Sequence, residues 1–211
     1  RDPETVVQTI AQLCQTRLPK NMGIPATEIQ VLSPTRKGET GTKNLNLALQ
    51  AVLNPPAAGK KEKRYGDFSF REGDRVMQIR NNYDILWKNP NGLGAGTGIF
   101  NGDIGVIVQI DYEAELVTVD FDDKRAKYAF DLLGELEPAY AMTIHKSQGS
   151  EYRAVILSAF AGSPYLLTRS VLYTAITRAR ELLIVVGDEE VLAAMVRNDR
   201  RQKRYSGLKL R

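Results

Sequence analysis

The chain has 211 residues, of which 43% are hydrophobic and 26% charged, and its formal net charge is +4. These values are ordinary for a globular protein, allow one large domain or two small ones, and are compatible with a polyanionic partner without requiring one. The single cysteine, Cys14, and the single histidine, His145, exclude an internal disulfide and a His/Cys zinc site.

No apolar stretch reaches the roughly 18 residues that a membrane span needs, and no secretory signal is visible. We therefore expect no membrane partner and a cytoplasmic setting. The chain begins with Arg1 rather than methionine, which we interpret as the start of a processed or excised fragment.

The first sixty residues show the pattern of an α/β unit. Residues 3–18 carry apolar side chains at helical spacing, with Asp2 as the expected N-cap. Residues 28–32 are a short apolar run, which indicates a buried strand. Helical periodicity returns in residues 42–53, and the Asn-Pro-Pro sequence at 54–56 stops that helix because proline lacks an amide hydrogen.

The middle of the chain changes to a β pattern. Residues 57–66 are small and basic, and we expect a linker there. Short alternating strands then follow from Phe68 to Glu137 and predict a small antiparallel barrel, which covers its own strand edges. The strands are expected at residues 75–80, 104–110, 116–121 and 127–130, with turns at Asn101-Gly102 and Asp122-Asp123.

After Pro138 the α/β pattern resumes. Continuous apolar runs at 154–160 and 181–187 predict strands that are covered on both faces. Helices are expected at 168–180 and 189–196, the second of them capped by Asp188. The barrel thus interrupts an α/β domain, and the expected division is 1–62 and 139–196 for that domain, 63–138 for the barrel, and 197–211 for a basic, solvated tail.

Three polar turns next to buried strands carry side chains that can hold phosphate. They lie in 29–46 (IQVLSPTRKGETGTKNLN), 140–152 (YAMTIHKSQGSEY) and 172–187 (LYTAITRARELLIVVG). Arg36 follows a strand end, where ligands of α/β sheets gather. The second segment offers short donors on an expected exposed turn, which suit a phosphate backbone, and Gly149 there would allow close backbone approach. These donors are Thr143, His145, Lys146, Ser147 and Gln148.

Together the three segments resemble motifs IV, V and VI of superfamily 1 helicases, most closely the RecD-like branch of the exodeoxyribonuclease V alpha type. The resemblance implies a RecA-like second motor domain without its own P-loop, interrupted by an SH3-like barrel. It implies an ATP-dependent DNA helicase that moves 5′ to 3′ in repair or recombination. ATP and Mg²⁺ would be bound mainly by an N-terminal motor domain outside this chain. The implied partners are single-stranded DNA, that domain, and other subunits of a RecBCD-type complex.

The resemblance also assigns roles to residues. Arg178 corresponds to the arginine finger, with Arg180 as the weaker alternative, and Arg36 corresponds to a γ-phosphate contact. Gly149 and Glu151 would face the nucleotide, with Glu151 on the ribose. Single-stranded DNA would be contacted by Thr143, His145, Lys146, Ser147 and Gln148. Because the sequence contains no G-x-x-x-x-G-K-[ST], we expect the chain alone not to hydrolyse ATP.

Simpler interpretations stay open for several of these features. Arg178 would be a salt-bridged helix arginine, Arg36 a solvated basic turn, and His145 a structural histidine. The whole chain would then be a non-catalytic nucleic-acid-binding or scaffolding module with a degenerate motor fold, a function that does not need the arginine of motif VI. A nuclease is disfavoured, because no acidic cluster surrounds a lysine or histidine.

Four further features have both a functional and a structural interpretation. Asp188 resembles the acid of a Walker B strand, yet helix capping is favoured. Residues 38–43 precede a helix and are a candidate anion site. The stretch 84–99 departs from the family pattern and is expected to be a long hairpin, with Trp87 packed on the barrel. Residues 111–123 hold six carboxylates and should face away from DNA.

Overall fold

A four-stranded parallel sheet organises the α/β part of the molecule, in the computed structural model that describes residues 2–92, 94–160 and 165–199. The strand order is β11-β1-β12-β13. The bounds are Ala141–Thr143 for β11, Ile29–Ser33 for β1, Tyr152–Ala159 for β12 and Ala179–Gly187 for β13. Strands of a parallel sheet are covered on both faces, which explains why β1 and most of β12 are buried along their length.

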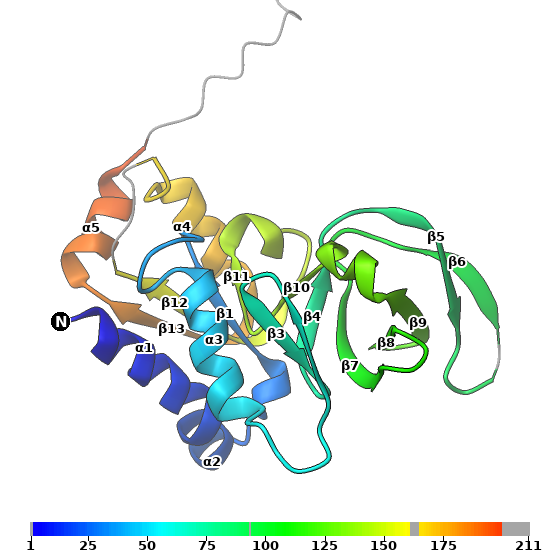
Figure 1. The fold of residues 1–211 in the computed structure, drawn as a ribbon. Coiled ribbons are helices and arrows are strands. Elements are labelled where there is room, and N and C mark those ends of the chain that lie inside the picture. Colours follow the sequence, from blue (N-terminus) through cyan, green and yellow to red (C-terminus); the bar gives the residue numbers. More distant parts are fainter. Residues whose placement is uncertain (1, 93, 161–164, 200–211) are drawn as a thin grey trace, which may run out of the picture.

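Helices cover both faces of this sheet (Figure 1). One layer contains α1 (Pro3–Gln12), the π-helical turn Leu13–Arg17, α2 (Leu18–Met22) and α3 (Thr42–Leu53). The other contains α4 (Arg169–Ile176) and α5 (Glu189–Arg197). Successive strand residues point to opposite layers: Val31 packs with α1 and α3, whereas Leu32 packs with α4 and α5.

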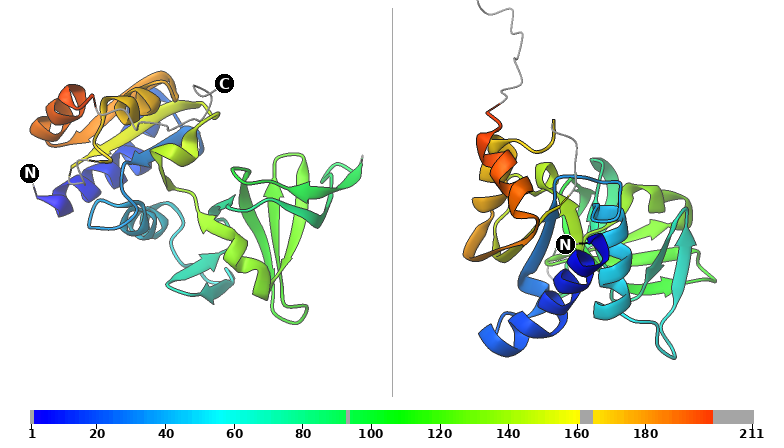
Figure 2. Two further views of the ribbon diagram at one scale, coloured as in Figure 1. Left: turned by 90° about the horizontal axis from the view of Figure 1, so that it is seen from above. Right: turned by 90° about the vertical axis from the view of Figure 1, so that its left-hand side faces the viewer.

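A separate antiparallel sheet surrounds its own hydrophobic core and forms the SH3-like barrel, in the order β10-β4-β7-β8-β9-β5-β6. In Figure 1 and the left view of Figure 2 the barrel lies to one side of the α/β part, and the hairpin β5–β6 lies on its far side. The strands are β4 (Arg75–Gln78), β5 (Asn82–Lys88), β6 (Ala95–Ile99), β7 (Ile104–Asp111), β8 (Leu116–Phe121), β9 (Lys124–Ala129) and β10 (Leu136–Pro138).

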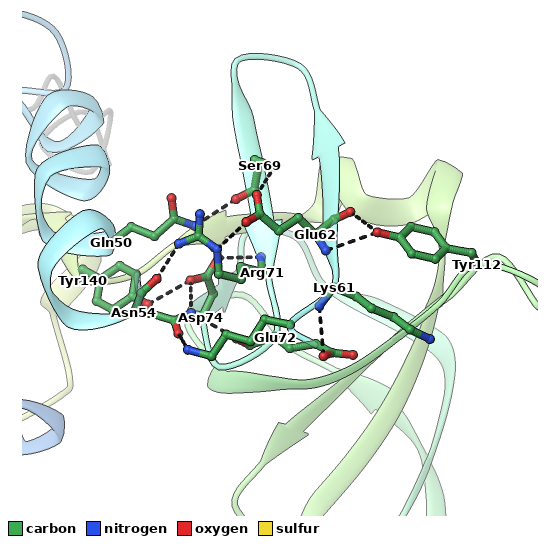
Figure 3. Close-up of polar contacts among 11 residues, drawn as sticks. Gln50, Asn54, Lys61, Glu62, Ser69, Arg71, Glu72, Asp74, Tyr112 and Tyr140 are labelled. Carbon is green, nitrogen blue, oxygen red and sulfur yellow. Dashed lines mark hydrogen bonds and ion pairs between the residues drawn. The ribbon is translucent and has the colours of Figure 1, made fainter. Parts of the chain in front are cut away.

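A two-stranded hairpin, β2 (Glu62–Tyr65) and β3 (Phe68–Arg71), stands between α3 and the barrel. Its anchor is Asp74, whose fully buried carboxylate accepts four hydrogen bonds (Figure 3). Oδ1 accepts from Asn54 Nδ2 at 2.7 Å and from the Tyr140 hydroxyl at 2.9 Å. Oδ2 accepts from Gln50 Nε2 at 2.6 Å and from the Arg71 amide at 2.7 Å.

We call these five residues the Asp74 network. Burial raises the pKa of Asp74, and the donated hydrogen bonds oppose that rise. The network also holds the Arg71 guanidinium, which donates to the Asn54 carbonyl and to Glu62 Oε1 at 2.8 Å. Because Gln50 lies in α3 and Asn54 directly follows it, while Arg71 and Asp74 lead into the barrel, the network fixes the two parts to each other.

The predicted elements agree with the structure at several places and differ at others. The helix 42–53, the strand 116–121 and the cap at Asp188 are confirmed. The linker expected at 57–66 is wrong in its second half, because residues 62–65 pair with β3. The first helix continues past residue 18 to Met22 through the π-helical turn. The helix expected at 168–180 ends at Ile176, because residues from Ala179 onwards are taken into the sheet.

The hairpin expected near 84–99 is present as β5–β6, and Trp87 packs on the barrel core. Most of the expected tail, residues 200–211, lies outside the described residues. Within the described ranges, no helix is long and apolar enough to cross a bilayer.

Candidate functional site

The residues singled out from the sequence lie at two opposite edges of the parallel sheet. Strands β1 and β11 end side by side, with Ser33 opposite Thr143, so the segments that follow them meet at the carboxyl edge. Strands β12 and β13 begin side by side at the amino edge, where the Tyr152 amide donates to the Arg178 carbonyl at 2.8 Å. The segment 144–151 therefore connects the two edges.

One carboxylate joins two of the predicted phosphate-binding cations at the carboxyl edge. Glu137 in β10 accepts from Arg36 Nη2 through Oε1 and from Lys146 Nζ through Oε2, each at 2.6 Å. The Arg36 side chain is 68% exposed, whereas those of Lys146 and Glu137 are 34% and 26% exposed. Both cations therefore remain in contact with solvent while they are paired.

The loop 36–41 is folded tightly against the start of α3. The amides of Thr42 and Lys43 donate to the carbonyls of Thr35 and Arg36 at 3.0 and 3.2 Å. A Cβ on Gly41 would lie 2.5 Å from the Lys37 carbonyl oxygen, so only glycine fits this turn. These donated hydrogen bonds leave few free amides at the helix start, which argues against the anion site that residues 38–43 suggested.

A cavity of about 430 Å³ opens beside this cluster. Its walls come from the loop 36–43, α3, the β2–β3 hairpin, β10 and the start of the segment 141–146. Its cationic side chains are Arg36, Lys37, Lys43 and Lys146. Its aromatic and aliphatic side chains are Tyr65, Phe68, Phe70, Leu47, Met77, Leu136, Pro138 and Met142.

The five donors predicted on the turn after β11 differ in accessibility. His145 and Gln148 are exposed, and Thr143 and Lys146 are half-buried. Ser147 is fully buried, and its hydroxyl donates to the Ile144 carbonyl at 2.7 Å. The expectation of an exposed Ser147 donor is therefore wrong, because this hydroxyl closes the 3-10 turn Ile144–Ser147 from inside.

Arg178 lies at the amino edge, between α4 and β13. Its guanidinium donates to the Thr174 carbonyl at 3.2 Å, to the Ser150 carbonyl at 2.9 Å and to the Thr177 hydroxyl at 3.1 Å. These acceptors are all neutral, and the side chain is partly exposed. Among the described residues no carboxylate forms an ion pair with Arg178, so its positive charge is positioned without being neutralised.

Glu151 is exposed and lines a polar cavity of about 410 Å³ together with Arg180. Arg153 closes one side of that cavity by bridging Glu181 at 2.8 Å and Glu28 at 3.0 Å, and these two carboxylates raise its pKa. Gly149 has a φ of +86° in open surroundings. Its glycine identity here serves the turn conformation of residues 147–150.

The structure does not bring Arg36 and Arg178 together. Arg36 follows the carboxyl end of β1, whereas Arg178 precedes the amino end of β13. A shared phosphate for both arginines is therefore not supported within this chain. The sequence also did not single out Glu137, Tyr65 or Asp74, because their roles depend on contacts between distant segments.

The remaining candidates have structural explanations. Asp188 Oδ1 accepts from the Glu190 amide at 3.2 Å and caps α5, as expected. Across the parts of the chain that the structure describes, no group of three or more His, Cys, Asp or Glu side chains is arranged to hold a metal ion.

Two family models match the chain. The SH3 domain of ATP-dependent RecD-like DNA helicases matches residues 45–121, and the UvrD-like helicase C-terminal domain matches residues 138–186. The chain is 34% identical over 168 residues to the ATP-dependent RecD2 DNA helicase of Deinococcus radiodurans, a match that covers 80% of this chain and 21% of that protein. It is 39% identical over 189 residues to the RecBCD enzyme subunit RecD of Mycobacterium tuberculosis, which covers 87% of this chain and 28% of that protein.

The chain thus spans less than a third of the length of these relatives. Among solved structures it is similar to the Pif1 helicase from Bacteroides in complex with ADP-AlF3 and ssDNA, with 17% identity, a TM-score of 0.48, and coverage of 90% of this chain and 46% of that one. The Pif1 helicase from Candida albicans gives 15% identity, a TM-score of 0.48, and coverage of 96% and 53%.

Proposed function

We propose that this chain, which belongs to the RecD-like superfamily 1 helicases, serves as the second half of an ATP-driven DNA motor. The family follows from the combination of a RecD-like helicase SH3 domain with a UvrD-like helicase C-terminal domain. In this proposal the amino edge of the sheet faces ATP held by a first motor domain, and the carboxyl edge contacts single-stranded DNA. Translocation from 5′ to 3′, a role in repair or recombination, and partners of the RecBCD type are part of the same proposal.

The observation that supports the ATP-facing role is the state of Arg178. The Arg178 guanidinium has three neutral acceptors and, among the described residues, no carboxylate in an ion pair with it. A guanidinium that is held in position without a carboxylate partner can bind an anionic group that another domain supplies. Bound ATP would supply such a group, since negative charge develops on the transferred phosphoryl oxygens and a guanidinium stabilises it.

The segment that contacts Arg178 fits the same role. Ser150 accepts from Arg178, and the next residue, Glu151, lines a polar cavity and has an exposed carboxylate that is a suitable acceptor for ribose hydroxyls. Arg180 lines that cavity and stays the weaker candidate for the phosphate contact. Mg²⁺ and the P-loop contacts are assigned to the first motor domain, because this chain shows no suitable ligand cluster among its described residues.

The support for the DNA contact is a group of exposed and partly exposed polar side chains at the carboxyl edge. His145 and Gln148 are exposed, and Thr143 and Lys146 are partly exposed, on the turn that follows β11. Hydroxyl, amide and cationic groups of this kind hold a phosphate backbone without reading base sequence. Ser147 supports the turn from inside, and Arg36 is reassigned from the γ-phosphate to this DNA-facing edge, where it shares Glu137 with Lys146.

The segment 144–151 offers a physical connection between the two functions. Its first residues lie at the DNA-facing edge, and its Ser150 carbonyl accepts from Arg178 at the other. When Arg178 turns toward a phosphate, its hydrogen bonds to Ser150, Thr174 and Thr177 rearrange, and the bond to Ser150 is the one that involves this segment. A displacement at Ser150 would then be transmitted along the segment to the turn that contacts DNA. We expect ATP hydrolysis and DNA strand movement to be coupled in this way.

ATP turnover in the full-length protein tests the proposal. Arg178→Ala should lower DNA-stimulated turnover by roughly 10³-fold or more, as for other arginine fingers, while nucleotide binding persists. Arg180→Ala is the matched control and should retain most of the activity. His145→Ala should weaken single-strand binding alike on all sequences. If Arg178→Ala left turnover near normal while DNA binding persisted, the chain would instead be a non-catalytic nucleic-acid-binding module.

A further inference from the structure

The cavity of about 430 Å³ at the carboxyl edge combines cations from the segments 29–46 and 140–152 with aromatic and aliphatic side chains that lie mostly outside those segments. Its four cations are Arg36, Lys37, Lys43 and Lys146, and its two carboxylates are Asp67 and Glu137. Apolar side chains form much of the remaining wall. A cationic rim over an aromatic and aliphatic interior matches the two chemical ends of a nucleotide, its phosphate and its base.

Glu137 stands where a phosphate would be held. Each of its oxygens receives a 2.6 Å hydrogen bond from a different cation, Arg36 on one side and Lys146 on the other. The two non-bridging oxygens of a backbone phosphate would be held between an arginine and a lysine in the same way. Because all three side chains are partly exposed, an incoming phosphate can compete with the carboxylate for both cations.

The base-sized part of the cavity is bordered by Tyr65 at the end of β2. Its ring is 40% exposed, and Leu47 on α3 is 42% exposed. The Tyr65 hydroxyl lies close to Gly134, since a Cβ there would be 2.6 Å from it. The β2–β3 hairpin that carries Tyr65 is tied to α3 by the Gln50 amide, which donates to the Ser69 carbonyl at 2.8 Å (Figure 3). The aromatic wall is therefore held in position before any ligand binds.

We propose that this cavity is a subsite for one nucleotide of single-stranded DNA, and that Glu137 occupies the phosphate position until DNA displaces it. The inference rests on the proposed function, because it extends the DNA contact of the turn 143–148 to the cavity. In the bound state a phosphate contacts Arg36 and Lys146, and the attached base stacks on Tyr65. Glu137 then weakens DNA binding by competition and makes release of the strand easier.

The phosphate part is tested by Glu137→Gln in the full-length protein, with fluorescence anisotropy of a labelled oligothymidylate. Removing the competing charge frees both cations, and affinity should rise by roughly three- to tenfold, the range expected for partly exposed ion pairs. Asp123→Asn is the control, since it removes one exposed negative charge in the β8–β9 turn and should change affinity much less. Weaker binding by Glu137→Gln would overturn the proposal, because it would make Glu137 a support for the two cations.

The base part is tested by Tyr65→Ala on two oligonucleotides of equal length, oligothymidylate and its abasic counterpart. Loss of stacking should weaken oligothymidylate binding by roughly tenfold and leave the abasic strand almost unchanged. Tyr65→Phe keeps the ring and should bind both strands like the wild type. Equal losses on both strands, or no loss on either, would overturn the base contact.

The outcomes separate this subsite from the wider proposal. If His145→Ala weakens binding while Glu137→Gln and Tyr65→Ala behave like the wild type, the DNA-facing edge is retained and the cavity is excluded as a subsite. If the full-length protein binds single-stranded DNA equally well with and without the His145→Ala, Glu137→Gln and Tyr65→Ala changes, the proposed DNA contact and the subsite both fail.

Discussion

Replacing Asp74 by asparagine tests whether the Asp74 network joins the barrel to the α/β part. Each carboxylate oxygen accepts two hydrogen bonds, from Asn54 and Tyr140 on Oδ1 and from Gln50 and Arg71 on Oδ2. In Asp74→Asn one oxygen becomes an NH₂ group, so whichever way the amide turns, two donors lose their acceptor and face another donor.

The magnitude follows from these contacts. Hydrogen bonds to a charged group contribute roughly 1.5–3 kcal/mol each, so two lost bonds amount to about 3–6 kcal/mol. The variant no longer buries a charge, which offsets part of that loss. We expect a net destabilisation of about 2–4 kcal/mol and a fall in Tm of roughly 5–15 °C for a chain of this size.

Urea unfolding followed by circular dichroism measures this change, with Asp67→Asn as the control. Asp67 is exposed and pairs only with Lys43 on the surface, so the control removes the same charge without disturbing a buried group. Tyr140→Phe removes one of the four donors to the same carboxylate and should lie between the two, at roughly 1.5–2 kcal/mol. An Asp74→Asn protein with the denaturation midpoint of the wild type would refute the assignment of the network as the joint.

Two further predictions use the same measurement. Because the folded state raises the pKa of Asp74 above its ordinary 3.8, protonation of this group favours folding. The stability difference between wild type and Asp74→Asn should therefore grow as pH falls through the folded pKa towards 3.8, and a difference independent of pH would contradict the shift. Gly187→Ala should destabilise the sheet by about 3 kcal/mol or more, since its Cβ would lie 1.9 Å from the Ala159 carbonyl oxygen. Gly59→Ala, at a similarly unusual φ but in open space, should cost only roughly 1–2 kcal/mol, so equal effects would exclude the clash as the cause.

Local patterns were sufficient for much of the fold. The continuous apolar runs of β12 and β13 and the periodicity of α3 each have a physical cause within one segment, and these elements were predicted close to their observed places. The linker expected at 57–66 was the main error in the first half of the chain. Its second half is polar, and it becomes a strand only because β3 is available to pair with it.

The candidate site was harder to predict because its arrangement depends on distant segments. Glu137 belongs to no recognised motif, and it matters because β10 places it between Arg36 and Lys146. Asp74 reads as an ordinary turn residue in the sequence, and its four donors come from positions 50, 54, 71 and 140. Arg36 and Arg178 lie at opposite edges of the sheet for a topological reason, since Arg36 follows the end of β1 and Arg178 precedes the start of β13.

The short connection between β10 and β11 has a mechanical consequence. Only Ala139 and Tyr140 separate the last barrel strand from the strand that leads into the turn at 144–147, and two residues reach about 7 Å when extended. Because the connection is this short, a rotation of the barrel relative to the parallel sheet would displace that turn. Under the proposed function, a force on the barrel would therefore be transmitted to the segment 144–151, whose Ser150 carbonyl accepts a hydrogen bond from Arg178.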